Sequence, residues 1–234
     1  MKSTFRPSVF LSVILFSSPV LSSAQSIVYD NTTKAETFSG GRQVVYTPAD
    51  PTAEFGDQVT LTNVPSDRTL SQFSFYYFYG GPATNQLTAT VRFYSNTGTN
   101  PPTAGNMFYQ SDSISLTNRN ATGYGTEMIL FSAANPAVNL PETFTWTVQF
   151  SNLGLGAAGL LAYGPPSVGT SFNDFWLSSG TSWQTETIVV GATVVADSSF
   201  GAQVTAVPEP SVYALGALAL LARLGLARYR RHRP

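Results

Sequence analysis

Two segments of this chain alternate apolar and polar residues, and this pattern restricts the fold more than any other feature of the sequence. In residues 87–94 (LTATVRFY), Leu, Ala, Val and Phe take one face and Thr, Thr, Arg and Tyr take the other; residues 143–150 (TFTWTVQF) repeat the pattern. Successive side chains of a strand point to opposite faces of its sheet, so both segments are predicted to be half-buried strands of an antiparallel sheet. The same alternation places Trp146 in the core. No stretch of the sequence sustains a period of 3.6 residues, so the body of the chain is not expected to contain helices.

Further strands are predicted where short β-type segments lie between turn residues. These segments are residues 58–62, 70–79, 107–110, 113–116, 127–131, 160–163, 172–177, 188–195 and 202–205. Turn residues such as Gly80-Gly81-Pro82 and Gly164-Pro165-Pro166 separate them. About ten short strands in roughly 180 residues predict an all-β, antiparallel two-sheet sandwich of jelly-roll-like type. The single domain is expected to span residues 25–206.

The first 24 residues have the pattern of a secretory signal peptide. Lys2 and Arg6 precede an apolar stretch at residues 9–16, and Ser22 and Ala24 are small residues placed three and one before a cleavage point. This arrangement predicts export by the Sec machinery and removal of residues 1–24. The mature chain is then expected to begin at Gln25.

Residues 207–234 combine three features in order: Pro208-Glu209-Pro210, an apolar segment at residues 212–227, and a basic tail at residues 228–234. The arginines of the tail are Arg228, Arg230, Arg231 and Arg233. The apolar segment predicts a transmembrane helix of roughly 24 Å, because a helix rises about 1.5 Å per residue. Arginines beside a membrane segment stay on the cytoplasmic side, so the body of the chain is expected outside. A surface helix capped by positive charge is the alternative, and it is disfavoured because apolar residues surround the helix.

This tail resembles the sorting signal of PEP-CTERM proteins, the exosortase substrates of Gram-negative bacteria that make exopolysaccharide. The resemblance rests on Pro208-Glu209-Pro210, on the apolar segment with its Leu-Gly-Ala pattern, and on the closing arginine cluster. It implies that an exosortase, a membrane-embedded enzyme similar to cysteine transpeptidases, cleaves the chain at or near the Pro-Glu-Pro motif. The resemblance further implies a precursor anchored in the inner membrane, followed by release to the outer envelope or extracellular matrix. Residues 54–75 also resemble the opening of a β-domain found with this signal, for which no activity is assigned.

The body of the chain is acidic and lacks the residues of several common active sites. Of twelve Lys and Arg, seven fall in the two targeting segments, whereas only Glu209 of thirteen Asp and Glu does, so the body has a net charge of about −7. A nucleic-acid partner is not expected, because phosphate binding needs a basic face. The only histidine is His232, in the tail, and there is no cysteine. Their absence from the body excludes a Ser-His-Asp triad, a Cys-His pair and a typical zinc site.

Aromatic residues are the first candidates for a binding site. Residues 73–79 (FSFYYFY) carry aromatic rings on both faces and are interpreted as a central strand, with Tyr76 as a candidate for stacking on a sugar ring. Trp176 and Trp183, in a Gly/Ser-rich segment, are further candidates for an exposed platform that binds carbohydrate. Anchoring of the core or of a loop is the alternative role for these rings.

Carboxylates are the second group of candidates. Asp50, Glu54 and Asp57 fall within eight residues just before a predicted strand, and hard oxygen ligands of this kind suit a structural Ca²⁺; a solvated turn is the alternative. No other cofactor is expected. A glycoside hydrolase needs only a facing pair of carboxylates, and Asp112, Glu127, Glu142, Asp174 and Glu186 could supply one. Nothing in their spacing selects a pair, so the chain is not expected to be an enzyme.

Two matches to the N-glycosylation pattern, Asn31-Thr32-Thr33 and Asn120-Ala121-Thr122, are interpreted as chance. Taken together, the sequence predicts an exported β-sandwich that serves as a structural or interaction protein of the outer envelope or extracellular matrix. A carbohydrate-binding module for exopolysaccharide is the alternative.

Overall fold

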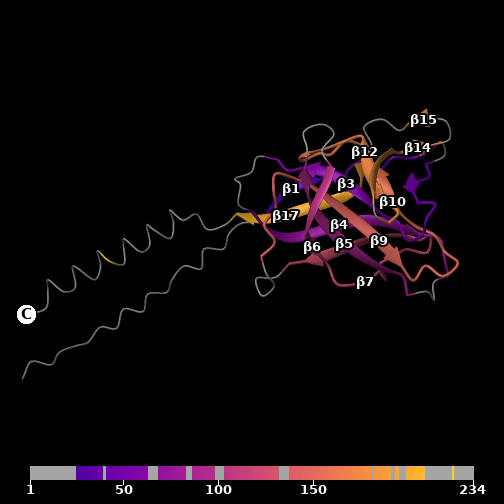
Figure 1. Ribbon diagram of the computed structural model, residues 1–234. Helices are drawn as coiled ribbons and strands as arrows, with labels where there is room; N and C mark the ends of the chain where they lie inside the picture. Colours follow the sequence, from indigo (N-terminus) through magenta and orange to yellow (C-terminus); the bar gives the residue numbers. More distant parts are fainter. Residues whose placement is uncertain are drawn as a thin grey trace, which may run out of the picture.

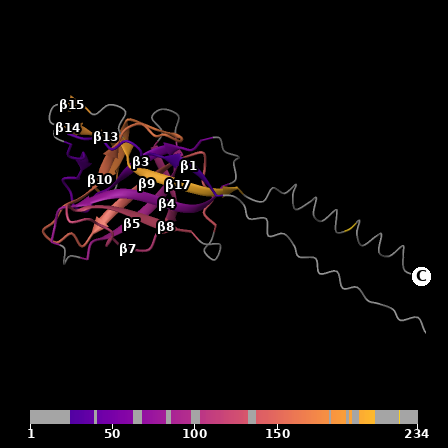
Figure 2. The ribbon, with the colours of Figure 1, turned by 180° about the vertical axis from the view of Figure 1, so that it is seen from behind.

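The described part of the chain is an all-β sandwich of two antiparallel sheets (Figures 1 and 2). The structure is a computed structural model, and it describes residues 25–38, 41–62, 68–82, 86–97, 103–131, 137–180, 182–190, 193–194, 199–208 and 223. One sheet has seven strands and the other has eight, and the short strands β14 (Val189–Val190) and β15 (Thr193–Val194) make a separate pair. The predicted all-β, two-sheet architecture is therefore confirmed.

The seven-stranded sheet is organised around the long strand β4 (Arg68–Tyr79). Its other strands are β1 (Ser26–Asp30), β2 (Val45–Tyr46), β8 (Tyr124–Leu130), β10 (Ala158–Tyr163), β16 (Ser199–Phe200) and β17 (Ala202–Pro208). β8 pairs with residues 72–78 of β4, whereas β17 and then β10 pair with its other edge. Strand β4 is thus paired along both edges, as predicted for a central strand.

The eight-stranded sheet follows the order β13-β12-β3-β9-β5-β6. These strands are β3 (Glu54–Thr60), β5 (Thr88–Thr97), β6 (Thr103–Gln110), β9 (Thr143–Ser151), β12 (Asp174–Ser178) and β13 (Trp183–Thr187). Two short strands complete the sheet: β11 (Thr170–Ser171) pairs with β3, and β7 (Ile114–Ser115) pairs with β5. The two segments with the clearest alternation are β5 and β9, which lie side by side near the centre of this sheet.

Aromatic side chains fill the space between the sheets. The inward residues of β4 are Phe73, Phe75, Tyr77 and Tyr79, and each is at most 2% exposed. The ring centre of Phe73 lies 5.2 Å from that of Trp146 in β9 and 5.2 Å from that of Phe93 in β5, so the two sheets meet through ring contacts. The prediction that Trp146 lies in the core is confirmed, since its side chain is fully buried.

Three features differ from the sequence prediction. β1 and β13 are strands that alternation did not single out, and residues 188–195, predicted as one strand, contain the antiparallel pair β14 and β15. The last strand, β17, runs on to Pro208, two residues beyond the expected domain boundary at 206. The first residue of the Pro-Glu-Pro motif therefore still pairs with the sheet, opposite Arg68.

Several sequence predictions lie outside the described residues. They are the signal peptide at 1–24, Glu209 and Pro210, the apolar segment 212–227 apart from Arg223, and the basic tail at 228–234. Among the residues that the structure does describe, no helix has the length and apolar character needed to cross a membrane.

Candidate functional site

Residues 35–38 and 41–46 form the two arms of a hairpin, which makes one wall of a groove on the outside of the seven-stranded sheet. Thr37 pairs with Gln43, and the N–H of Phe38 donates to the carbonyl of Arg42 at 2.7 Å. Gly41 takes a φ of 77° in the turn, a left-handed conformation that glycine adopts without strain. Because β2, the end of this hairpin, pairs with β10, the hairpin is fixed to the sheet and its tip presents Phe38 and Arg42.

The opposite wall is made by β4 and β8. Phe78 and Tyr124 pair across these strands, and their ring centres lie 5.3 Å apart. Both rings point away from the core, because the neighbours of Phe78 along the strand, Tyr77 and Tyr79, point into it. This wall is therefore an aromatic surface that stays partly open to solvent.

The turn before β8 is held by the side chain of Asn120. Its Oδ1 accepts hydrogen bonds from the N–H of Thr122 at 3.0 Å, from the Thr122 hydroxyl at 2.7 Å, and from the N–H of Tyr124 at 3.0 Å. An asparagine that bonds to its own following backbone is a standard way to fix a tight turn. The second N-glycosylation match thus has a structural role, and it positions Thr122 and Tyr124 on the groove wall.

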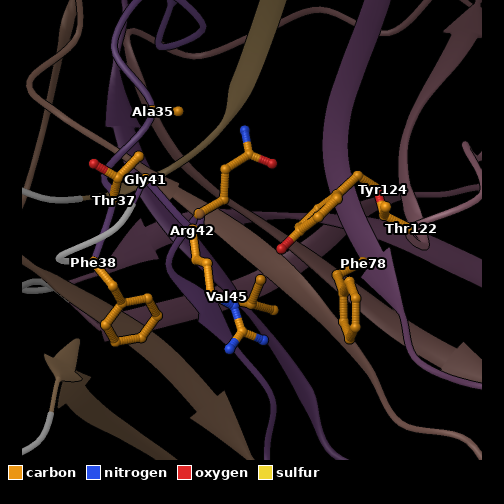
Figure 3. A pocket seen from close by; sticks show the side chains of 10 residues that line it. Ala35, Thr37, Phe38, Gly41, Arg42, Val45, Phe78, Thr122 and Tyr124 are labelled. Carbon is orange, nitrogen blue, oxygen red and sulfur yellow. The ribbon is translucent and has the colours of Figure 1, made fainter.

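The groove between the hairpin and the aromatic wall has a volume of about 1190 Å³. Figure 3 shows the side chain of Arg42 running between the rings of Phe38 and Phe78 in that view, with the hydroxyl of Tyr124 turned toward the same space. Its other lining residues are Ala35, Thr37, Gly41, Gln43, Val45 and Thr122. The described lining of this groove contains aromatic, small and amide side chains and one cation, but no carboxylate.

A second, smaller cavity adjoins the groove at Thr122. It has a volume of about 490 Å³ and lies between residues 79–82 and residues 119–123. The guanidinium of Arg119 lies there, 4.8 Å from the ring centre of Tyr79, in a cation–π contact. Because Tyr79 points into the core, this contact places the Arg119 guanidinium against the inward side of β4 and not in the groove.

The positive charge of Arg42 is not neutralised within the described part of the chain. No hydrogen bond or ion pair there engages its guanidinium, whereas the neighbouring Lys34 pairs with Glu36 at 3.5 Å. In the opposite sheet Arg92 pairs with Glu54 at 2.8 Å. With respect to the described residues, Arg42 thus has an uncompensated charge in the groove.

The predicted tryptophan platform lies on the outer face of the eight-stranded sheet. The pairing of β12 with β13 puts Trp176 and Trp183 on the same face, but Trp176 is only 6% exposed. It lies opposite Gly56 in the pairing of β12 with β3. Trp183 is partly exposed and packs edge-to-face on Tyr94 at 5.3 Å. The structure therefore places both rings on one face without exposing both of them.

A polar cluster centred on Glu54 lies on the same face of the eight-stranded sheet. Its carboxylate accepts hydrogen bonds from Arg92, Tyr94 and Thr147, with the Tyr94 hydroxyl at 2.8 Å. Burial raises the pKa of Tyr94, and the hydrogen bond to Glu54 adds to that effect. The carboxylate of Glu54 is thus fully engaged by groups of the protein itself.

Tyr76, the third predicted stacking residue, faces outward from β4 on the same side as Phe78. Its ring packs against Tyr163 of β10 at 5.1 Å, and it does not line the groove. Burial raises the pKa of Tyr163 to about 12, and the neighbouring Tyr76 contributes to the rise. Tyr76 therefore supports the sheet beside the groove.

The three carboxylates considered for calcium lie in different environments. Asp50 is exposed and accepts hydrogen bonds from the N–H and hydroxyl of Thr52, which lower its pKa. Glu54 faces outward from β3, whereas Asp57, three residues later, faces the core and is fully buried. The structure does not bring them together, because positions separated by an odd number of residues point to opposite faces of a strand. Among the described residues no group of three His, Cys, Asp or Glu could hold a metal ion.

The carboxylates considered for glycoside hydrolysis belong to separate segments: Asp112 follows β6, Glu127 lies in β8, Glu142 precedes β9, and Asp174 and Glu186 lie in β12 and β13. Asp174 pairs with Thr187 and Glu186 with Phe175, so these two acids point to opposite faces of adjacent strands. A third cavity, of about 190 Å³, lies between residues 47–55 and 150–158. None of the described residues that line the three cavities is a carboxylate.

Sequence reasoning did not identify the groove. Its residues come from three separate segments, and only the fold brings Phe38 and Arg42 close to Phe78 and Tyr124. One signal was present: Arg42 is one of five Lys and Arg in the body, and it follows Phe-Ser-Gly-Gly, a turn sequence with an aromatic residue at its start. A scarce cation near an aromatic residue at a turn is a sequence pattern that is compatible with a binding site.

Comparisons with protein families, with curated proteins and with solved structures find no match to this chain.

Proposed function

We propose that this chain is an exported PEP-CTERM protein, sorted by an exosortase, that works as a structural or interaction protein of the outer envelope or extracellular matrix of a Gram-negative bacterium. The observation that carries this proposal is the tail at 207–234, in which the Pro-Glu-Pro motif, the apolar segment and the arginine cluster follow one another. The signal-peptide pattern at 1–24 supports it, because it predicts that the same chain is exported. In this proposal the precursor is held by a C-terminal transmembrane helix, and exosortase is its processing partner.

The proposal includes a jelly-roll-like fold for the body. Eight main strands, taken in chain order, are β1, β3, β4, β5, β6, β8, β9 and β17. In one sheet the neighbouring strands are β1-β17-β4-β8, which are numbers 1, 8, 3 and 6 of the eight. In the other sheet they are β3-β9-β5-β6, which are numbers 2, 7, 4 and 5. Two Greek keys wound together produce this order of strands, and it supports the jelly-roll assignment. Residues 152–201 then add β10 to β16 between the last two main strands.

The positions of the two ends of the body support processing at both of them. Ser26 of β1 pairs with Ala206 of β17, so the expected start of the mature chain lies beside the approach to the Pro-Glu-Pro motif (Figure 1). Figure 2 shows β1 and β17 side by side from behind as well. Ser26 and Ala206, which are close in sequence to the two expected cleavage points, are therefore neighbours, and this supports processing of both ends at the membrane.

Carbohydrate binding is the second candidate function of the body, and the groove favours it. Ligand sites are concave and mostly apolar, with a few polar groups that orient the ligand. The groove has this character, with three aromatic rings and one arginine. Catalysis is not proposed, because no carboxylate lines the described walls of the groove and the body has no histidine or cysteine.

Intact-mass measurement tests the sorting proposal. Protein recovered from the extracellular matrix of the native cells is expected to have the mass of a chain that starts near Gln25 and ends near Pro210. A double substitution, Pro208→Ala with Pro210→Ala, is expected to leave the precursor uncut in the membrane fraction. Matrix-borne protein with a complete C-terminus would overturn the proposal.

A further inference from the structure

We propose that the groove between the hairpin and the β4–β8 wall binds an acidic polysaccharide through its carboxylated sugar residues. In this proposal Arg42 pairs with a sugar carboxylate, and Phe38, Phe78 and Tyr124 hold the sugar rings. The inference names the substrate class for the second candidate function, carbohydrate binding, and rests on it.

Aromatic exposure is the first argument. Phe38 is 40% exposed at the tip of its hairpin, and Phe78 and Tyr124 are partly exposed on the facing wall. The other aromatic residues of β4 mostly point into the core, so these rings are not needed to hold the sheets together. Flat rings that present an apolar face beside a hydroxyl suit sugar rings, which have apolar faces and polar edges.

Charge is the second argument, and it selects an acidic sugar. The body carries twelve Asp and Glu against five Lys and Arg, yet the described lining of the groove holds a cation and no acid. The nearest acid on the hairpin, Glu36, is paired with Lys34. A guanidinium pairs with a carboxylate through two parallel hydrogen bonds, and such charged bonds are about twice as strong as neutral ones. A neutral sugar would leave this charge without a partner.

The negative charge of the body does not prevent this pairing. Exposed charges separated by more than about 8 Å are largely screened at physiological salt. The charges that act on a bound sugar are therefore those that line the groove, and Arg42 is the charged residue of its described lining.

Size is the third argument. Small-molecule sites are typically about 300 to 1,000 Å³. The groove, at about 1190 Å³, exceeds that range, and the smaller cavity continues it past Thr122. This space suits a chain of several sugar units better than a single small ligand. Nucleic acid fits less well, because phosphate backbones are bound by several cations.

Calorimetric titration of the full-length protein in detergent micelles tests the proposal. Oligogalacturonate is the probe, a malto-oligosaccharide of equal length tests sugar rings without carboxylates, and polyglutamate tests carboxylates without sugar rings. The expected result is binding of oligogalacturonate at least about tenfold tighter than binding of either control, since each charged bidentate contact contributes strongly. Arg42→Gln is expected to weaken that binding about tenfold or more, and Phe38→Ala by a similar factor.

Lys34→Gln is the matched control, because it removes the same charge just before the hairpin, from a residue that does not line the groove. It is expected to change the affinity less than about twofold, in line with the small effect of exposed ion pairs. Because Arg42 and Phe38 lie near the hairpin tip, their variants are expected to unfold at the same temperature as the original protein. Thermal unfolding thus checks that the variants are folded.

Three outcomes would overturn the inference: no binding of oligogalacturonate, equal binding of the malto-oligosaccharide or of polyglutamate, or equal effects of Arg42→Gln and Lys34→Gln. Equal binding of polyglutamate would identify a site for acidic peptides instead. The sorting proposal is tested by the mass of the processed chain, which does not depend on polysaccharide binding. The two proposals can therefore fail independently.

Discussion

Asp57 is a carboxylic acid in the interior of the sandwich. Its Oδ2 accepts a hydrogen bond from the N–H of Phe200 at 3.0 Å, and its side chain is fully buried. Burial raises its pKa well above the usual value, Asp174 adds to the rise, and the N–H groups of Phe200 and Gln58 oppose it. Burial and the same carboxylate also raise the pKa of Tyr29. The folded protein therefore favours the neutral form of Asp57.

The stability of the protein is expected to depend on the ionisation of Asp57. A carboxyl whose pKa is raised by folding contributes its full stability below the pKa of the unfolded chain and loses it as pH rises through the pKa of the folded state. The free energy of unfolding is therefore expected to fall as pH increases above about 4, the ordinary range of Asp. Asp57→Asn, which keeps the shape without the charge, is expected to flatten this dependence and to raise Tm at pH 7 by a few degrees.

Thermal unfolding followed by circular dichroism between pH 4 and pH 8 measures this effect. Asp112→Asn is the control, because it removes one carboxylate from an exposed loop and changes the net charge equally. If Asp57→Asn and the control had the same pH dependence as the original protein, Asp57 would not be the source of that dependence.

At the scale of elements, β3 and β9 approach each other very closely at Gly56. A Cβ atom built on Gly56 would lie 2.0 Å from the carbonyl oxygen of Trp146 and 2.5 Å from the Cα of Thr147. These are backbone atoms of a central strand, so they cannot turn aside as the end of a side chain can.

Gly56→Ala is therefore expected to lower the free energy of unfolding by about 2 to 3 kcal/mol, because the added methyl group forces the two strands apart. Gly41→Ala is the comparison: it has open space around it and a φ of 77°, so only backbone strain of about 1 kcal/mol opposes the substitution. Denaturant unfolding compares the two variants, and a loss at Gly56 no larger than that at Gly41 would contradict the steric argument.

Local alternation predicted the strands that have one apolar face and one polar face. β5 and β9 combine an apolar face with Thr, Arg and Gln on the other, and their limits agree with the prediction to within a few residues. The prediction that residues 143–150 are only half-buried was wrong, because Thr145 and Thr147 on the polar face of β9 are fully buried as well. β13, with the sequence WQTET, is an edge strand whose residues are mostly exposed. Because neither face is buried, its sequence does not alternate between apolar and polar residues. Such a strand is defined by its pairing with β12, which local sequence does not encode.

The candidate site was less accessible to sequence reasoning than the fold was. Its residues belong to a hairpin, to a central strand and to the strand after a turn, and their proximity depends on long-range pairing. Spacing in the sequence suggested instead that Asp50, Glu54 and Asp57 could act together. Two of them belong to one strand, but the alternation of that strand sends Glu54 outward and Asp57 inward.

At the scale of the whole molecule, β17 completes the seven-stranded sheet at the end of the body. It pairs with β4 along one edge and with β1 along the other, and its inward residues Ala202, Val204 and Ala206 are buried. A chain that ends at Gly201 is therefore expected not to fold, because β1 loses its only neighbour in the described sheet and the core is opened. A chain that ends at Pro208 keeps every pair of β17 and is expected to unfold at the same temperature as the full chain.

Circular dichroism and thermal unfolding distinguish the two truncated chains. Cooperative unfolding of the chain that ends at Gly201, near the Tm of the longer one, would show that β17 is dispensable.

The position of β17 between two neighbours has a mechanical consequence for a chain tethered at its C-terminus. Hydrogen bonds of antiparallel strands run perpendicular to the strands. A pull at Pro208 along the strand therefore loads the bonds to β1 and β4 together, in shear, instead of breaking them one after another. If the precursor is tethered through the residues that follow Pro208, a force that pulls the body away from the membrane would act on β17. The hydrogen bonds of β17 to β1 and β4 would then resist this force in shear.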